Sequence, residues 1–350
     1  MNQQSKIWQT KTHPKIAVMR SLPGLGDFLC IVPALRSLRV AAPEAHIALI
    51  GLAGVSHLVR RFAAYIDELL IFPGFPGIPE VPFNAAKTQS FLELAQSSEF
   101  DLILQMHGNG VCTNKFIDLL SAKQKAGFCT KDGYCPNASS FLLYPETVPE
   151  VWRHLRLMEF LGVSHQGPQL EFPILTEDWQ EWTTIAARRS LAANYVCIHP
   201  GASTADRRWP PEHFAQIADE LAMRGLQVVL TGTRQELDLT EAVAAAMKFP
   251  SLNWAGCTSL GTLAILLKGA QILICNDTGV SHLADALQTK SVVIFSNSDP
   301  VRWAPLNQRL HRIVCTSKQQ PSSWLYTKPI VSPVLTEVFD LLEQDFAYAS

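Results

Sequence analysis

The chain is 350 residues long, which is enough for two domains of ordinary size, each with its own hydrophobic core. Its 29 Lys and Arg residues are balanced by 31 Asp and Glu residues, which argues against a general nucleic-acid-binding protein. No uninterrupted apolar run approaches the ~18 residues that cross a bilayer. The polar segment 1–14 lacks the apolar centre of a signal peptide and predicts a disordered tail.

Eight cysteines are scattered through the chain without a C-x-x-C motif, and most of them lie in apolar runs. This distribution is typical of reduced core residues in a cytoplasmic protein. Cys129 and Cys135 are close enough in sequence to suggest a metal site, but core thiols are the simpler interpretation. We therefore expect neither a bound metal nor a cofactor.

The first regular unit is a strand over 15–20, a glycine loop over 21–27 and a helix over 28–39. Leu29 replaces the third glycine of a dinucleotide-binding motif, so the loop argues only weakly for NAD. Asp27 stands at the predicted helix start. It either caps the helix, or it is a carboxylate held where open α/β sheets bind ligands, able to act as a general base.

Alternating strand and helix patterns continue through this half and predict a parallel sheet covered on both faces. A strand over 100–106 opens into a glycine-containing turn, whose polar residues either satisfy turn geometry or bind a polyol. Basic residues nearby either contact a phosphorylated acceptor or are solvated surface charges, and Lys123 and Lys125 belong to this group. The candidates for acceptor binding are His107, Asn109, Arg60 and Lys115.

A linker over 162–173 and a helix over 177–192 precede a second strand series. Its first strand, over 195–199, leads into a loop over 200–211 that is rich in hydroxyl groups and contains Arg207. Guanidinium and hydroxyl donors match phosphate oxygens, so this loop is a candidate phosphate site. An ordinary loop anchored by Trp209 is the alternative.

Two further loops of this half carry candidate ligands. After the strand over 227–231, Glu236 either bridges ribose hydroxyls or suits a first helical turn. After the apolar run 271–275, Asp277-Thr278-Gly279 lead into a helix. A helix start offers unpaired N–H groups and a partial positive charge, which favours an anion such as phosphate. N-capping explains Asp277 and Thr278 equally well.

In their combined order, these motifs resemble glycosyltransferase family 9, the family of the ADP-heptose:lipopolysaccharide heptosyltransferases. The resemblance covers roughly residues 15–305. It rests on Gly26-Asp27 with Pro33-Ala34-Leu35-Arg36, the His199-Pro200-Gly201-Ala202-Ser203 loop that ends at Trp209-Pro210, Gly232-Thr233-Arg234-Gln235-Glu236, Ala255-Gly256 with Ser259-Leu260, and Asn276-Asp277-Thr278-Gly279 with His282-Leu283-Ala284. The resemblance implies an α/β protein of GT-B type, with two Rossmann-like domains facing a central cleft.

Carried over by position, the resemblance implies a role for each matching residue. Asp27 is expected to deprotonate the acceptor hydroxyl. Arg207 stands where the family commonly has a Lys that contacts the donor diphosphate. The implied donor-binding set is Ser203, Thr204, Arg207, Glu236, Asp277, Thr278, Gly279 and His282. One segment departs from the family, because Phe295-Ser296-Asn297-Ser298 replaces the common F-G-P-T and leaves donor identity open.

These observations divide the chain into four expected parts. They are the tail over 1–14, an acceptor-binding domain over 15–166, a nucleotide-sugar-binding domain over 167–332, and a C-terminal helix over 333–350 that crosses back to the first domain.

The expected activity is inverting transfer of a sugar, by resemblance a heptose from ADP, to a glycolipid or oligosaccharide acceptor such as a lipopolysaccharide core. No D-x-D motif is present, so metal-independent transfer is expected. The expected location is the cytoplasm, at the inner face of the cytoplasmic membrane, with peripheral membrane contact. A nucleotide-sugar 2-epimerase, a non-catalytic nucleotide-sugar-binding protein and a nicotinamide dehydrogenase are the alternatives.

Overall fold

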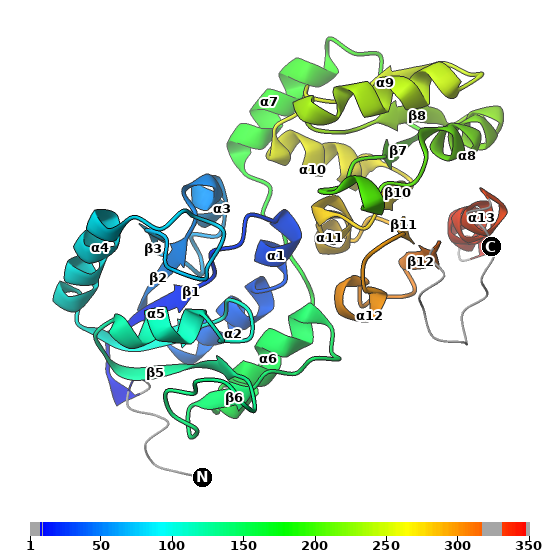
Figure 1. Cartoon of the computed structure of the whole chain (residues 1–350). Coiled ribbons are helices and arrows are strands. Elements are labelled where there is room, and N and C mark those ends of the chain that lie inside the picture. The colour runs from blue at the N-terminus through cyan, green and yellow to red at the C-terminus, as the bar shows by residue number, and fades with distance from the viewer. Residues whose placement is uncertain (1–7, 9, 317–330, 348–350) are drawn as a thin grey trace. The chain divides into compact units, whose positions relative to one another are not determined.

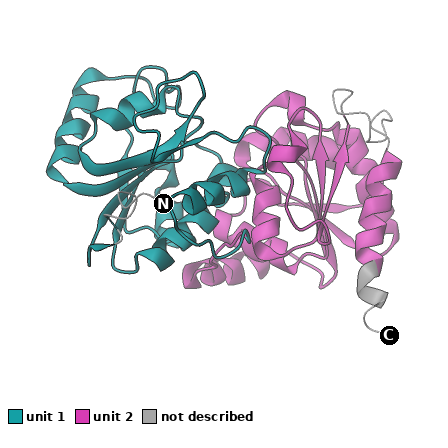
Figure 2. Ribbon diagram, turned by 90° about the horizontal axis from the view of Figure 1, so that it is seen from below, with its two compact units in different colours: residues 1–169 teal, residues 170–350 magenta. Residues whose placement is uncertain are grey.

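The chain divides into two compact units, residues 1–169 and residues 170–350 (Figure 2). The structure, a computed structural model, describes residue 8, residues 10–316 and residues 331–347. The predicted boundary lies at 166/167, close to this division. Each unit is an α/β layer structure, with helices packed against a central sheet (Figure 1).

The first unit is built on one six-stranded parallel sheet in the order β3-β2-β1-β4-β5-β6. The strands are β1 (Lys15–Met19), β2 (His46–Gly51), β3 (Glu68–Ile71), β4 (Phe100–Gln105), β5 (Ala122–Cys129) and β6 (Phe141–Leu143). The helices are α1 (Leu25–Leu29), α2 (Val32–Ala41), α3 (Ser56–Arg61), α4 (Ala85–Ser97), α5 (Thr113–Leu119) and α6 (Glu150–Phe160), with a 3₁₀ turn η2 (Ala53–Val55).

The second unit repeats the same sheet plan, in the order β12-β11-β10-β7-β8-β9. The strands are β7 (Tyr195–His199), β8 (Gln227–Leu230), β9 (Ser251–Asn253), β10 (Leu273–Asn276), β11 (Ser291–Phe295) and β12 (His311–Cys315). The helices are α7 (Thr176–Ala186), α8 (Pro211–Met223), α9 (Leu237–Ala246), α10 (Leu260–Gly269), α11 (Gly279–Leu287), α12 (Pro300–Trp303) and α13 (Val331–Ala347), with 3₁₀ turns η3 (Ala205–Arg207) and η4 (Arg234–Glu236).

Both sheets therefore follow the Rossmann strand order, 3-2-1-4-5-6 when each unit is numbered from its own first strand. Every residue of strands β4, β7 and β10 is buried, as expected for parallel strands covered by helices on both faces. The prediction of an α/β chain with two Rossmann-like domains is confirmed. The point at which the strand order reverses lies between β1 and β4 in the first unit and between β7 and β10 in the second, although all strands remain parallel.

The helix predicted over 28–39 is in fact two helices, α1 and α2, separated at Cys30 and Ile31. Pro33 explains the break, because it has no N–H to donate and its ring would clash with the carbonyl of Leu29 in a continuous helix. The helix predicted over 177–192 likewise ends earlier, at Ala186.

Three strands escaped prediction: β5, β6 and β12. Strand β5 contains polar residues on its exposed positions and reads poorly as a buried strand. It carries Lys123, which pairs with the buried Asp101 at 2.8 Å, and Lys125, which pairs with Asp118 at 3.2 Å. Both lysines thus form ion pairs within the first unit, and their interpretation as acceptor contacts stays untested.

The predicted disordered tail is packed where the structure describes it. Trp8 is fully buried, and Lys11 forms a 2.7 Å ion pair with Asp101. Burial would raise the pKa of Asp101, but hydrogen bonds from Lys11, Lys123 and the Lys15 backbone lower it to about 2. An indole and a charge partner thus fix residues 8 and 11 to the first unit, while residues 1–7 and 9 lie outside the described residues.

The C-terminal helix also differs from expectation. Instead of crossing back to the first domain, α13 packs on the second unit, against α8, β11 and β12. Val334, Val338 and Leu341 are fully buried in that unit's core, and Lys290 donates a hydrogen bond to the Leu341 carbonyl. Its apolar stripe covers the face of the sheet beside β11, which explains its position.

Leu341→Ala should lower the free energy of unfolding by about 2–5 kcal/mol, because it removes a buried side chain and leaves a cavity. Urea unfolding would measure the change. Glu343→Ala, at an exposed position of the same helix, is the control and should change stability little. Equal effects of the two substitutions would contradict the packing of α13 on this core.

Candidate active site

Most of the predicted site residues lie near the point of each sheet where the strand order reverses. In the first unit Asp27 follows β1 and His107 follows β4, and these two strands are neighbours. In the second unit Arg207 follows β7 and Asp277 follows β10, which are again neighbours. Open α/β sheets bind ligands at the carboxyl ends of the strands flanking such a reversal. Two strand pairs far apart in sequence thus create one candidate site in each unit.

Asp27 lies inside the first turn of α1, and the N-cap residue of this helix is Gly24. The interpretation of Asp27 as the N-cap residue was therefore wrong. Its Oδ1 atom accepts a hydrogen bond from Arg20 at 3.2 Å, and the side chain is 25% exposed. A carboxylate that is anchored at one oxygen and still reachable is suited to accept a proton.

The Asp27 carboxylate lies against the backbone of Gly24. A Cβ atom at Gly24 would stand 2.4 Å from Asp27 Oδ2, too close for any real contact. Gly24 has an ordinary extended conformation, with φ of −75°, so the absence of a side chain matters for space alone. The loop between β1 and α1 therefore leaves room for the Asp27 carboxylate over its backbone.

His107 is buried, in contrast to what an acceptor-binding role would favour. Its Nδ1 atom accepts a hydrogen bond from the Ser21 N–H at 3.1 Å, and its Nε2 atom lies 3.6 Å from Glu80. Burial, together with the positive charge of Arg20, lowers the pKa of His107 to about 4. It is therefore neutral near pH 7 and ties the β4 loop to the β1 loop.

The other candidates for acceptor binding come from separate elements. Asn109 accepts a hydrogen bond from the Val111 N–H at 3.2 Å through its side chain, which is the turn geometry weighed as its alternative. Arg60 lies in the last turn of α3, and Lys115 lies in α5, both exposed. An acceptor role for these three residues stays a prediction.

In the second unit, Asp277, Thr278 and Gly279 form the turn between β10 and α11. Thr278 is the N-cap residue, but its side chain caps nothing, so the first N–H groups of α11 point to the end of the helix without a capping partner from Thr278. The N-terminus of this nine-residue helix carries partial positive charge and suits an anion.

Arg207 stands beside this turn, with its Nη1 atom 3.9 Å from Asp277 Oδ2 and its side chain 33% exposed. The neighbouring Arg208 behaves differently, because it donates to the Ala202 carbonyl at 2.9 Å and 3.1 Å and so holds the loop itself. Of these two arginines, Arg207 is thus the one that lies beside Asp277. Ser203 and Thr204 are exposed on the same loop.

Burial raises the pKa of Asp277, although the nearby Ser298 and the charges of His282 and Arg207 oppose the rise. His282 is itself buried on the first turn of α11 and meets the ring of Trp303 edge-on at 6.1 Å. These neighbours shape the turn around Asp277 and keep a partly compensated carboxyl group under the helix N-terminus.

Glu236 closes the third strand end of this edge, after β8. Its Oε2 atom accepts hydrogen bonds from the Thr233 N–H at 2.8 Å and from the Thr233 hydroxyl at 2.9 Å, which is a capping arrangement. A Cβ atom at Gly201 would stand 2.0 Å from Oε1, so the carboxylate lies directly on the β7 loop. The fold thus brings Glu236 to the same loop as Ser203 and Arg207.

Sequence reasoning assigned no role to three residues that hold this site together. Asn276, buried at the end of β10, donates to the Pro200 carbonyl at 2.8 Å and accepts from the Trp209 N–H at 3.0 Å, so it fixes both ends of the β7 loop. Asn297 donates a hydrogen bond to Asp206, next to Arg207. In the first unit, Arg20 is the residue that was missed. Two sequence signals could have indicated them: Asn276 directly precedes the Asp277-Thr278-Gly279 motif, and Arg20 is a cation at the end of an apolar strand.

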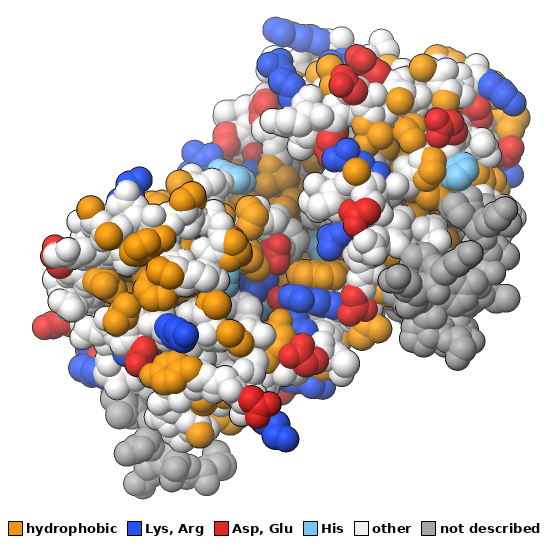
Figure 3. Space-filling view, viewed as in Figure 1, with side chains coloured by type: hydrophobic (Ala, Val, Ile, Leu, Met, Phe, Trp, Pro, Cys, Tyr) orange, Lys and Arg blue, Asp and Glu red, His pale blue; other side chains and the backbone are white. Residues whose placement is uncertain are grey.

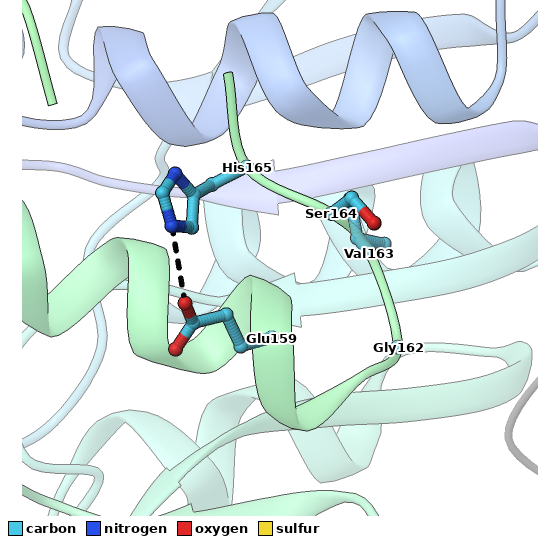
Figure 4. Close-up of a pocket in the computed structure, with 5 residues that line it drawn as sticks. All are labelled: Glu159, Gly162, Val163, Ser164 and His165. Atoms are coloured by element: carbon cyan, nitrogen blue, oxygen red, sulfur yellow. Dashed lines mark ion pairs between the residues drawn. The ribbon is translucent and has the colours of Figure 1, made fainter. Parts of the chain in front are cut away.

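Other features of the chain carry no chemistry for this site. A cavity of about 390 Å³ at the end of α6 is lined by Glu159, Gly162, Val163, Ser164 and His165, and contains none of the predicted residues (Figure 4). Its most prominent contact is a 3.2 Å ion pair between His165 and Glu159.

Burial, together with the nearby Cys135, raises the pKa of Cys129 to about 12. Among the described residues, no group of three or more His, Cys, Asp or Glu side chains is arranged to hold a metal ion. None of the helices in the described ranges has both the length and the hydropathy needed to cross a bilayer.

Comparison with known proteins agrees with this picture. Residues 91–327 match the model of glycosyltransferase family 9 (heptosyltransferase). Lipopolysaccharide heptosyltransferase 2 of Escherichia coli K12 is 27% identical over 173 residues, which are 45% of this chain and 49% of that protein. The chain thus spans about half the length of that relative.

Solved structures share the fold over nearly the whole chain. A glycosyl transferase family 9 protein from Veillonella parvula superposes with a TM-score of 0.79 at 21% identity, covering 95% of this chain and 98% of that one. An E. coli heptosyltransferase with ADP superposes with a TM-score of 0.67 at 19% identity, covering 93% and 99%. The fold is therefore of GT-B type, as predicted.

Asp277→Asn should make stability less dependent on pH. Because burial raises the pKa of Asp277, the folded protein holds this proton more tightly than the unfolded chain does. Stability contributed by the neutral group is lost as pH rises from the unfolded value, about 3.9, through the folded pKa. The asparagine cannot ionise, so the variant should gain stability relative to the wild type across this window.

Urea unfolding of both proteins between pH 4 and pH 8 would measure this difference. A difference in the free energy of unfolding that stays constant with pH would show that Asp277 does not titrate in this way.

Proposed function

Because the chain belongs to glycosyltransferase family 9, the heptosyltransferase family, we propose that it transfers a heptose from an ADP-linked donor to a hydroxyl group of a lipopolysaccharide core or related glycan. The observation that carries the proposal is the arrangement at the second reversal point, where Arg207 stands beside the N-terminus of α11. The ADP in one structural neighbour and the lipopolysaccharide acceptor in the name of a relative support the choice of substrates.

On the donor side, the leaving group is a nucleoside diphosphate, and negative charge develops on it as the glycosidic bond breaks. The Arg207 guanidinium and the N–H groups at Thr278 and Gly279 supply positive charge at one place. Ser203 and Thr204 add hydroxyl donors from the β7 loop. Glu236, which lies on that loop, holds the ribose hydroxyls through the oxygen that faces Gly201. These cationic and dipolar groups support transfer without a metal ion.

On the acceptor side, Asp27 is the base. The acceptor hydroxyl gives its proton to the Asp27 carboxylate, its oxygen forms a bond to the anomeric carbon, and the bond from that carbon to the diphosphate oxygen breaks. The electron pair leaves with the nucleoside diphosphate. One displacement of this kind inverts the anomeric centre. His107, Asn109, Arg60 and Lys115 are proposed to line the acceptor side.

The acceptor of such a reaction is a glycolipid, so we also propose that the protein acts at the inner face of the cytoplasmic membrane. On the face shown in Figure 3, Lys and Arg side chains are interspersed with Asp and Glu rather than gathered in one basic field. Peripheral contact would therefore depend on local groups and on the acceptor itself rather than on a general attraction to anionic lipid.

A direct assay separates this function from its alternatives. The protein is incubated with ADP-heptose, with and without a heptose-deficient lipopolysaccharide, and products are analysed by mass spectrometry. Mass gain on the acceptor with release of ADP supports the transferase. Isomerised donor without acceptor would identify the 2-epimerase instead. Donor binding without any turnover, detected by thermal shift with ADP, UDP and GDP sugars, would identify a non-catalytic binding protein.

Asp27→Asn should lower turnover by ~10² or more, because the amide cannot take the hydroxyl proton. Donor binding, measured by calorimetry with ADP, should stay within experimental error of the wild type. Asp132→Asn, at an exposed loop position, is the matched control and should remain fully active. Near-normal turnover of Asp27→Asn would remove this residue from the role of base.

Arg207→Glu should weaken ADP binding roughly tenfold or more, because a charge-assisted contact to the diphosphate becomes a repulsion. The side chain is partly exposed, so the thermal midpoint should change little. Arg309→Glu is the control with the same charge change. Arg309 is exposed and precedes β12, so it lies near the amino ends of the strands, whereas Arg207 lies at their carboxyl ends. An unchanged dissociation constant for ADP in Arg207→Glu would refute the assignment.

A further inference from the structure

Arg20, the residue that ends the first strand segment, is the centre of a buried cluster of charges beneath Asp27. Its side chain is only 3% exposed. Nη1 donates to the Met106 carbonyl at 2.9 Å, and Nη2 donates to Asp27 Oδ1 at 3.2 Å and to Glu150 Oε1 at 3.1 Å. The same Nη2 atom also contacts the Asp27 carbonyl at 3.2 Å. One guanidinium therefore joins α1, the end of β4 and α6.

On this basis, and given the proposed function, we propose that Arg20, backed by Glu150, is a positioning residue that holds the Asp27 carboxylate in place and sets the pH range in which it accepts a proton. Arg20 does not itself need to touch substrate. It acts through Asp27, whose Oδ1 it binds, while Oδ2 lies over Gly24.

Glu150 makes this arrangement rigid. It is the first residue of α6, is 2% exposed and accepts from Arg20, from Arg153 and from His154 at 3.3 Å. Arg153 is fixed in turn by the Pro145 carbonyl at 3.0 Å and by the ring of Tyr144, 4.5 Å from its guanidinium carbon. The far side of Arg20 is thus a packed polar network, and a buried network of this kind restricts the movement of its members.

The charges of the cluster balance. Two guanidinium groups, Arg20 and Arg153, face two carboxylates, Asp27 and Glu150. Burial lowers the pKa of His154 to about 4, against the opposing effect of Glu150, so this ring is neutral near pH 7. Loss of any one of the four charges leaves an uncompensated charge in the cluster.

Other titratable groups near Arg20 do not disturb this balance. His107, on the loop after β4, is neutral near pH 7 because burial and Arg20 lower its pKa to about 4. Glu80 faces the outer nitrogen of that ring, at 3.6 Å. The charge of Arg20, bound to Asp27 Oδ1, favours the carboxylate form of Asp27, and Glu150 moderates that effect.

Two substitutions that each remove one charge of the cluster should have opposite effects. Arg20→Gln removes the favourable charge and should move the acid limb of the kcat/KM profile to higher pH by on the order of one unit. Glu150→Gln leaves the Arg20 charge less balanced and should move the same limb to lower pH. In both variants kcat should fall at least tenfold, while KM for the donor stays within about twofold, since the donor loops belong to the other unit. General loss of structure would not produce shifts of opposite sign.

Three further variants complete the test. Arg20→Lys keeps the charge without the two-pronged geometry, so the limb should stay near the wild-type pH while kcat remains reduced. Gly24→Ala displaces the carboxylate without changing charge, and should lower kcat at an unchanged midpoint. Arg39→Gln is the matched control, because it removes another partly buried arginine of the first unit, paired with Asp67 at 2.6 Å, and should leave the profile unchanged.

A readout independent of turnover separates this inference from the proposed function. The carboxyl ¹³C signal of Asp27 is titrated by NMR in the wild type, Arg20→Gln and Glu150→Gln. Opposite displacements of its midpoint support the inference even if no sugar is transferred. Identical midpoints in all three proteins would overturn it, whether or not the wild type is active. If Arg20→Gln does not fold, Glu150→Gln and Arg20→Lys against the wild type still decide the outcome by the same comparison.

Discussion

The site depends on a constraint of parallel sheets: strands that are neighbours in the sheet end at the same edge, however far apart they are in sequence. In the first unit this constraint brings the loops after β1 and β4 together, and in the second unit the loops after β7 and β10. Because both sheets have the same strand order, the reversal point falls at corresponding places. The candidate residues of each unit therefore lie in loops and first helical turns that follow buried parallel strands.

The two units treat charge differently at these points. In the first unit the carboxylate of Asp27 belongs to a balanced cluster in which Arg20, Glu150 and Arg153 satisfy one another. A balanced cluster is tolerable in a low-dielectric interior and fixes its members precisely. This is what a base requires, since its position relative to a hydroxyl group determines how well it works.

In the second unit the positive charge of Arg207 is less closely paired with a carboxylate. Arg207 is partly exposed and lies at the outer limit of an ion pair with Asp277, and the N-terminus of α11 adds a dipole at the same turn. Asp277 remains buried with a raised pKa, which is unfavourable for the free protein at neutral pH. Such a cost is common at sites whose groups are arranged for a ligand rather than for stability.

The segment that departs from the family pattern, residues 295–298, contributes to this arrangement. Asn297 donates a hydrogen bond to Asp206, and Ser298 interacts with Asp277. The replaced residues thus join the β7 loop, which carries Arg207, to the turn before α11. The departing segment therefore lies against the two loops that carry Arg207 and Asp277.

The sequence by itself determined the alternation of strands and helices, the two-domain division and the candidate residues that follow the central strands, because apolar periodicity and glycine-rich turns are local signals. It failed for β5, whose lysines obscured a buried strand, and for the break before Pro33, which a continuous apolar face concealed. Only the tertiary structure showed that Arg20 and Glu150 meet beneath Asp27, that Arg208 holds its own loop while Arg207 lies beside Asp277, and that α13 packs on the second unit. Those facts depend on contacts between residues up to 130 positions apart, such as Arg20 and Glu150, which no local pattern can encode.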